Sequence, residues 1–453
     1  MNSEKNSGEK KHDDKTFEID LEDMEAWFKR GNDLLDMRRF EEAIECYNKI
    51  LEIDQTLEGL WYNKGLVLYY LGRFEEANVC YDKVLEIDPQ AADVWANKGL
   101  ALGDFGRLQE AIECYDKSLE INPQNAHVWT NKGKAFDDFG RLQEAIECYD
   151  KALEIDPNYT KAWNNKGRIL ENSGRVQEGI ECYKKAIELD SNYAHPHYNY
   201  GTFLLNKGRY LEAAEHLKKV IEIDPNLAEA HLNYAIVLKN MGRTRFVEAE
   251  KHYKKALELK PDMGLIHRNY ALFLFCVGPE RFAEADKHFK KTLESDPRDA
   301  EILWAYGYLL SKMERERYPE AEKYLRKALE INPKDGGSWE ILGWLYLLME
   351  RLEDGVDCLM MALTFSNQLP DKGKGVFSEL PSLAENLSVK FHDYVSAFGS
   401  DEEKCDACYR LAMVYKILVD EEKVEYWCRE GEKYCKDFPE MKQKLDVMQK
   451  LKV

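Results

Sequence analysis

The sequence predicts an all-α fold, built as a solenoid of stacked helical hairpins. Two observations lead to this fold class. Tryptophans recur at intervals of 34 residues, and a glycine follows each of them after four residues. Between these marks, apolar residues have the spacing of a buried helix stripe, in two segments of about 14 residues separated by a short turn such as Gly72-Arg73. A single hairpin cannot cover its apolar face, so the units must stack.

The recurring residues suggest how each hairpin packs. Bulky aromatic side chains fill the space between the helices, glycine and alanine let the helices approach closely, and proline ends the second helix. The first helices carry Trp27, Trp61, Trp95, Trp129 and Trp163, with Gly31, Gly65, Gly99, Gly133 and Gly167. The second helices carry Ala43, Ala77, Ala111, Ala145 and Gly179, with Tyr47, Tyr81, Tyr115, Tyr149 and Tyr183, and several units close at Pro89, Pro123, Pro157 and Pro225.

This unit resembles the tetratricopeptide repeat, and ten copies cover residues 24–369. The copies begin at Met24, Glu58, Ala92, Ala126, Thr160, Ala194, Ala228, Gly264, Ala300 and Gly336. The resemblance implies a right-handed superhelix whose first helices line a concave groove that binds other polypeptides. In the sixth, seventh and eighth units His197, His231 and His267 replace the tryptophan, and the seventh, eighth and ninth units have two extra residues at the turn.

Both ends of the chain depart from the repeat. Residues 1–23 are predicted to form a disordered tail, and residues 370–404 a loop followed by a capping helix with an apolar stripe. Residues 405–453 are read as a degenerate eleventh repeat and a C-terminal helix. The loop markers are Pro370, Gly373, Gly375 and Pro381, and the stripe is Leu383, Leu387, Phe391, Val395 and Phe398. The alternative is that this stripe docks a partner.

Composition narrows the classes of partner and location. The formal net charge of −20 argues against nucleic acid, because binding phosphates needs clustered lysine and arginine. No apolar run is long enough to span a membrane, and the polar N-terminus is not a secretory signal. We therefore expect a cytoplasmic protein whose partners are proteins or peptides, with no nucleic acid and no membrane.

Asparagine occupies the sixth position of seven consecutive units, which the resemblance places in the groove. An asparagine side chain can pair with both the C=O and the N–H of an extended peptide. Helices about 8–10 Å apart and a peptide rise of about 3.3 Å per residue would match one asparagine to roughly every third peptide residue. The alternative is that these amides bond only within the stack. The row is Asn63, Asn97, Asn131, Asn165, Asn199, Asn233 and Asn269.

Charged and aromatic residues are expected beside this row. Lys134, Arg168 and Lys161 are candidates for binding a carboxylate of the peptide. Acidic residues lie close by, so the groove is mixed in charge. Tyr62, Tyr69 and Tyr70 form a candidate aromatic pocket, or pack on the first repeat.

No catalytic residues, cofactor or metal site are predicted. Recognised catalytic motifs are absent, and the part outside the repeats leaves no room for a catalytic domain. Cys405, Cys408, Cys428 and Cys435 could hold a structural zinc, but a C-x-x-C inside a helix lacks the usual turn. The predicted function is a scaffold or adaptor for an extended polypeptide. The competing function is self-association into a homo-oligomer through the C-terminal helices.

Overall fold

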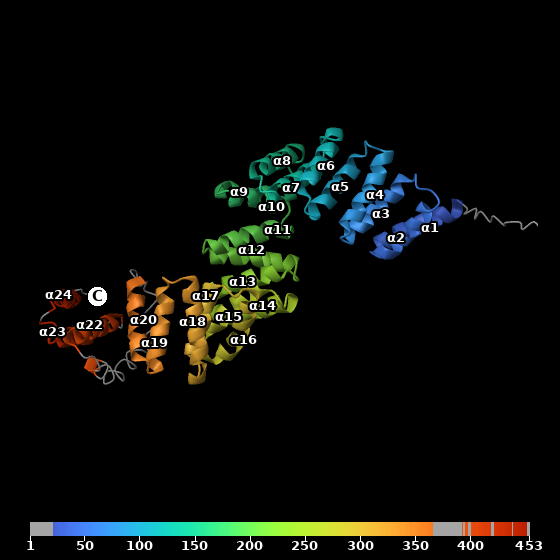
Figure 1. Cartoon of the computed structure of the whole chain (residues 1–453). Helices are drawn as coiled ribbons and strands as arrows, with labels where there is room; N and C mark the ends of the chain where they lie inside the picture. Colours follow the sequence, from blue (N-terminus) through green and yellow to red (C-terminus); the bar gives the residue numbers. More distant parts are fainter. Residues whose placement is uncertain are drawn as a thin grey trace, which may run out of the picture. The chain divides into compact units, whose positions relative to one another are not determined.

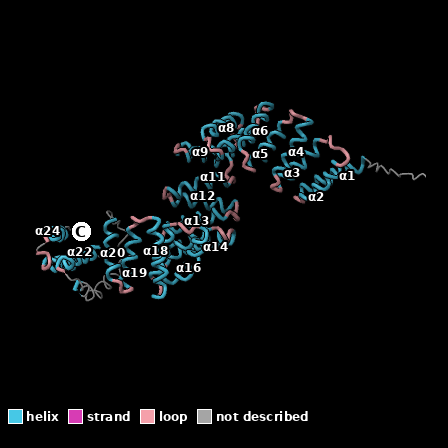
Figure 2. The backbone as a smooth tube through the Cα atoms, in the orientation of Figure 1, coloured by secondary structure: helices cyan, strands magenta, loops and turns pink. Residues whose placement is uncertain are grey.

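A computed structural model describes residues 21–365, 392, 395, 396, 400–417, 421–436 and 438–450. All regular structure in these residues is helical, and no strand occurs among them. Figure 1 and Figure 2 show the helices following one another as antiparallel pairs. The all-α class and the stacked hairpins are therefore confirmed. Most of the predicted tail, and the loop with most of the Leu383–Phe398 stripe, lie outside the described residues.

The chain divides into two compact units. The first comprises residues 1–207 and 215–224, and contains five complete hairpins and the first helix of the sixth. Its helices are α1 (Leu21–Asp36), α2 (Phe40–Leu51), α3 (Glu58–Tyr70), α4 (Phe74–Ile87), α5 (Ala92–Asp104), α6 (Leu108–Ile121), α7 (Ala126–Asp138), α8 (Leu142–Ile155), α9 (Thr160–Asn172), α10 (Val176–Leu189) and α11 (Ala194–Asn206). The boundary divides α12 (Tyr210–Ile223). Helix α1 begins three residues before Met24, within the segment expected to be a tail.

The second unit comprises residues 208–214 and 225–453. Its repeat helices are α13 (Ala228–Met241), α14 (Phe246–Leu259), α15 (Gly264–Val277), α16 (Phe282–Ser295), α17 (Ala300–Ser311), α18 (Tyr318–Ile331), α19 (Gly336–Leu348) and α20 (Leu352–Phe365). The extra residues of three units form short 3₁₀ turns, η1 (Arg243–Arg245), η2 (Pro279–Arg281) and η3 (Arg315–Arg317). In each unit, the first helices of successive hairpins pack against one another.

Each N-terminal hairpin is held together by a close contact between glycine and tyrosine. A Cβ atom added to Gly31, Gly65 or Gly133 would lie 2.6, 2.6 or 2.7 Å from a ring carbon of the tyrosine on the second helix. Only glycine allows the helices to approach this far, because packed interiors leave no free space for an added methyl group. In the seventh and eighth units Ala235 and Ala271 take the glycine place, and both of these hairpins have the longer turn.

The tryptophans also carry a polar function that periodicity did not reveal. The indole N–H of Trp95, Trp129 and Trp163 donates to the carbonyl of the proline six residues earlier, at 3.1, 3.0 and 2.8 Å. Trp339 makes the same bond in the tenth unit, at 2.9 Å. Because that proline lies in the linker between hairpins, each bond ties a first helix to the segment that leads into it.

Histidine pairs replace this arrangement in the middle units. Nε2 of His231 and of His267 lies 3.0 and 2.8 Å from the carbonyls of Pro225 and Pro261, so each ring takes over the bond of the indole. A ring that donates through Nε2 in its neutral form accepts at Nδ1. There it faces Nδ1 of His252 or His288, at 2.9 and 2.7 Å. His197 and His216 form a third pair, with Nδ1 atoms 3.0 Å apart.

Burial opposes charging these pairs. It lowers the pKa of His252 and of His288 to about 4, and the facing histidine adds to the effect in each case. Glu248 and Glu284 raise these pKa values, but burial, the facing histidine and nearby lysines lower them, and burial is the largest effect. His252 and His288 are therefore neutral when the protein is folded near neutral pH.

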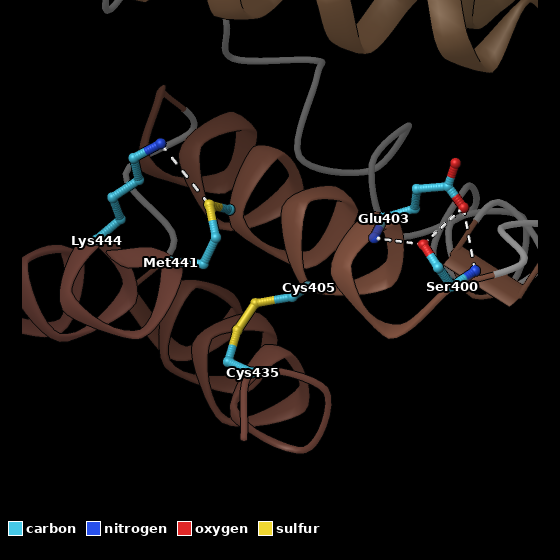
Figure 3. The surroundings of a disulfide bond; sticks show 6 residues. All are labelled: Ser400, Glu403, Cys405, Cys435, Met441 and Lys444. Atoms are coloured by element: carbon cyan, nitrogen blue, oxygen red, sulfur yellow. Dashed lines mark hydrogen bonds between the residues drawn. A yellow bond between two sulfur atoms is a disulfide. The ribbon is translucent and has the colours of Figure 1, made fainter. Parts of the chain in front are cut away.

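Three helices close the second unit, namely α22 (Asp401–Ile417), α23 (Glu421–Glu432) and α24 (Pro439–Lys450). They share one apolar core with α19 and α20, to which Trp344, Leu359, Leu411 and Trp427 belong. Helix α22 begins four residues before the expected boundary at Cys405. The reason is a capping box, in which Ser400 and Glu403 each accept a hydrogen bond from the backbone N–H of the other (Figure 3).

The C-terminal cysteines do not converge on one point. Cys405 and Cys435 form a disulfide between α22 and the segment after α23, with Cα atoms 5.7 Å apart (Figure 3). Cys408 and Cys428 are buried and outside this bond. Among the described residues, no group of three or more potential ligands is arranged to hold a metal ion. The four cysteines are thus one disulfide-bonded pair and two further buried cysteines.

The glycine contact predicts opposite effects for two similar substitutions. Gly133→Ala should lower the free energy of unfolding by about 1–3 kcal/mol, because the new methyl group overlaps the Tyr149 ring. Gly103→Ala is the matched control in another first helix. There the nearest atom is 3.8 Å from the added Cβ, so stability should rise by about 0.5–1 kcal/mol. Urea denaturation followed by circular dichroism measures both, and equal effects would refute the packing argument.

The histidine pairs predict a loss of stability in mild acid. The folded pKa values of about 4 lie below the ordinary value of 6.5, so unfolding takes up protons between these limits. The free energy of unfolding is therefore unaffected by these groups above about pH 6.5. It falls by roughly 2 kcal/mol per pair as the pH is lowered towards 4.

The chain itself offers the matched variant for this test. The double substitution His231→Trp and His252→Cys restores the residues that other units carry at these positions. Its free energy of unfolding should fall less steeply between pH 6.5 and 4.5 than that of the wild type, and parallel curves would contradict the assignment.

Candidate peptide-binding face

The predicted asparagines lie on the first helices of both units, and each is half-buried. We call the surface formed by α3, α5, α7, α9 and α11 the first-helix face of the N-terminal unit. Asn63, Asn97, Asn131, Asn165 and Asn199 belong to it, whereas Asn233 and Asn269 lie on α13 and α15 of the C-terminal unit.

Three of these amides point one N–H towards the preceding hairpin. Asn63 donates to Oδ1 of Asn32 at 3.0 Å, Asn97 to the hydroxyl of Tyr62 at 2.9 Å, and Asn199 to Oδ1 of Asn164 at 2.9 Å. The shared direction fixes the rotamer of each side chain. Stacking bonds therefore exist, as the structural alternative predicted, but they use only one of the two amide protons.

The other ladder residues have different surroundings. Asn165 accepts from Nδ2 of Asn164 at 3.2 Å, and Asn269 donates to the carbonyl of Leu265 in its own helix at 2.8 Å. Asn131 makes no side-chain hydrogen bond to any described residue. The row is regular in position but uneven in its bonding, and Asn131 is the member that internal contacts explain least.

An acceptor and a donor remain available at three of the seven asparagines. Asn63, Asn97 and Asn199 each keep the side-chain oxygen and a second N–H, the pair needed to bond one peptide group of an extended chain. The internal bond pre-orients the amide, which reduces the conformational entropy that a ligand would have to remove.

The basic candidates are already paired, with one exception. Lys134 lies 3.6 Å from Asp104, and Arg168 forms an ion pair with Asp137, so in both cases the acid comes from the preceding first helix. Asp104 also accepts from the hydroxyl of Tyr69 at 2.5 Å. A peptide carboxylate would compete with these acids. Lys161 is exposed and has no ion-pair partner among the described residues.

Tyr69 and Tyr70 meet edge to face, with ring centres 5.8 Å apart, whereas Tyr62 lines a groove without them. Tyr70 stacks on Phe40 of the first repeat, with ring centres 5.8 Å apart, and Tyr69 is held by Asp104. Tyr62 lines a groove of about 430 Å³ between α3 and α5, beside Asp93. The equivalent groove between α1 and α3, of about 370 Å³, is lined by apolar residues such as Phe28 and Leu57.

Sequence reasoning did not predict which residues hold the asparagines in place, although it named Tyr62 as a possible pocket residue. Tyr62 and Asn164 occupy the fifth position of their units, and Asn32 the ninth position of the first. The available signal was geometric, because the fifth and ninth positions of one helix face the sixth position of the next.

Of the described helices, none has the length and apolar character to cross a membrane.

The stacked hairpins and their first-helix face define a repeat array of the kind that serves as a scaffold for protein–protein interactions. Tetratricopeptide-repeat models match residues 25–57, 60–90, 92–125, 126–159 and 160–193, and two further models of the same repeat match residues 192–262 and 280–335. The chain belongs to the tetratricopeptide-repeat family.

Solved structures of helical-repeat proteins resemble parts of the chain. YrrB, described as a TPR protein with an unusual peptide-binding site, is 24% identical, with a TM-score of 0.33, and the match covers 41% of this chain and 95% of YrrB. PilF of Pseudomonas aeruginosa is 21% identical, with a TM-score of 0.42, and the match covers 47% and 96%. The human IFIT1 dimer with PPP-AAAA is 18% identical, with a TM-score of 0.44, over 76% and 83%. A search of curated proteins gave no match.

Proposed function

We propose that the chain is a scaffold that binds an extended segment of a partner polypeptide along its first-helix face and acts by binding, without catalysis. The observation that carries this proposal is the pre-oriented row of amides, in which Asn63, Asn97 and Asn199 each retain an acceptor and a donor after bonding within the stack. The amides recognise peptide groups, which every sequence possesses, so neighbouring side chains must supply the selectivity.

Those neighbours favour a segment of mixed character. Asp93 beside Tyr62 suits a residue with a basic or hydroxyl end, and Lys161 suits an acidic one. The apolar groove at Phe28 and Leu57 suits an aliphatic or aromatic residue near one end of the segment. The cytoplasm is the compartment we expect for this interaction.

Two asparagine variants separate ligand binding from internal packing. Asn131→Ala should leave the unfolding midpoint unchanged, because that side chain has no internal hydrogen bond. Asn199→Ala should lower it, since it removes the donor to Asn164, a residue only 4% exposed. Peptides selected on the wild type from a random display library supply the probe, and anisotropy measures their affinity.

The expected result is a 2- to 10-fold weaker affinity for Asn131→Ala, as the loss of about 0.5–1.5 kcal/mol from one hydrogen bond implies. Asn158→Ala, in an exposed linker, is the control that should change neither property. Unchanged affinity in Asn131→Ala would reject the ladder. A doubled mass in sedimentation equilibrium, together with no selectable peptide, would favour self-association instead.

A further inference from the structure

The first helices of the C-terminal unit change character at the ninth and tenth hairpins. Ala305 and Ile341, both buried, occupy the sixth position there, so the amide row has ended. Beside them, α17 presents Trp304 and Tyr308, whose rings stack with centres 6.0 Å apart at 26°. The fifth position of α19 is Glu340, which is largely withdrawn from solvent.

These residues lie at the contact of α17 with α19. A Cβ atom placed on Gly337 would be 3.2 Å from Nε1 of Trp304, so the indole covers that glycine. Gly337 and Glu340 are three residues apart and share one face of α19. The carboxyl group therefore lies one helical turn from the indole, and Trp344 follows one turn further along the same face.

Polar atoms are left without partners at this place. Oε1 of Glu340 and the indole nitrogens of Trp304 and Trp344 are buried and have no hydrogen-bond partner among the residues that the structure describes. Glu340 takes part in no hydrogen bond or ion pair with any described residue. A buried carboxylate without a partner costs several kcal/mol, so such groups are normally paired.

Three acidic residues of the same unit have an arginine partner, whereas Glu340 has none among the described residues. Glu250, Asp286 and Glu322 in the same unit are each paired with an arginine from a later hairpin. The pKa of Glu250 is lowered to about 2, with the hydrogen bond from Arg281 as the largest cause. Burial alone raises the pKa of Glu340 to about 8, and no basic side chain offsets it. The missing element is a cation.

A cation already lies between the first helices one hairpin earlier, at the contact of α15 with α17. Arg268, at the fifth position of α15, reaches α17 and its N-cap, where Nε lies 2.9 Å from Asp299 and the guanidinium also pairs with Glu301. In the following hairpin the fifth position is Trp304 where the previous hairpin has Arg268. The second position of the hairpin after that is Gly337, which corresponds to Glu301. This exchange replaces an internal ion pair by an aromatic surface beside an unpaired acid.

We propose that Glu340, with Trp304 and Tyr308, forms a binding site for the cationic side chain of a lysine or arginine on a partner polypeptide. The aromatic faces attract a cation through their quadrupoles, and the carboxylate balances its charge. Nζ of Lys312 lies 5.7 Å from the centre of the Tyr308 ring, so this ring already attracts an ammonium group. A partner with basic residues also suits a chain of net charge −20. The site uses no ladder asparagine and goes beyond the proposed function.

A small probe tests this site without a polypeptide partner. The chain has nine tryptophans, so its indole N–H groups give a small set of NMR signals, in which Trp304→Phe and Trp344→Phe identify the two relevant ones. Nα-acetyl-lysine methylamide should shift the Trp304 signal saturably. The neutral analogue Nα-acetyl-norleucine methylamide should not, because it lacks the charge. Binding near pH 7 should also release protons, since the cation favours the ionised carboxylate.

The matched variant is Glu340→Gln, which keeps the shape and removes the charge. It should weaken the lysine probe at least fivefold and abolish proton release, while circular dichroism shows an unchanged fold and equal or greater stability. Asn131→Ala should bind the probe as the wild type does, so failure of the ladder and failure of this site are distinguishable. Equal shifts with both probes, no shift with the lysine probe, or unchanged binding in Glu340→Gln would each overturn the proposal.

Discussion

The approach of the two helices within each N-terminal hairpin depends on one contact, that of a bare glycine against a tyrosine ring. With Gly65 opposite Tyr81, for example, a single added methyl group would lie 2.6 Å from the ring. This contact sets the separation of the helices, and the same separation repeated along the chain brings successive first helices together. Every feature of the first-helix face, including the asparagine row, depends on that spacing.

Periodicity predicted this framework well because packing residues repeat with the unit. The same residues also have polar functions that a pattern of large and small side chains does not reveal. Trp129 was predicted as a bulky packing residue, but its N–H also secures the linker by bonding the Pro123 carbonyl. His231 makes the equivalent bond, so the change from Trp to His preserves the donor while it replaces the ring. An interpretation of repeat drift that considers only size misses this equivalence.

The candidate site could be predicted in position but not in bonding. The sixth place of each unit follows from counting residues, and the structure puts all seven asparagines half-buried on first helices. The partner of each amide depends on the fifth and ninth places of the preceding unit, which vary along the chain. Asn97 meets Tyr62, Asn199 meets Asn164, and Asn131 meets no described partner. Likewise, the sequence indicated acidic residues near Lys134 and Arg168, but the particular pairs with Asp104 and Asp137 are known only from the structure.

A repeat array tolerates local costs that a single globular core would not, because each hairpin contacts only its neighbours. An unpaired Glu340 therefore lowers the stability of its own interface without disturbing the glycine contacts elsewhere. The chain's own units serve as an internal control. Some positions hold the same residue type throughout the N-terminal units, such as the glycine and the aromatic residue opposite it. Packing determines the residue type at these positions. Other positions on the first helices change from unit to unit, such as the fifth position, which is Arg268, then Trp304 and then Glu340. Packing does not determine the residue at these positions, so they can contact a ligand. Because the packing contacts in the neighbouring hairpins are intact, the absence of a partner for Glu340 among the described residues is better explained by a cation from outside than by a failure of the fold.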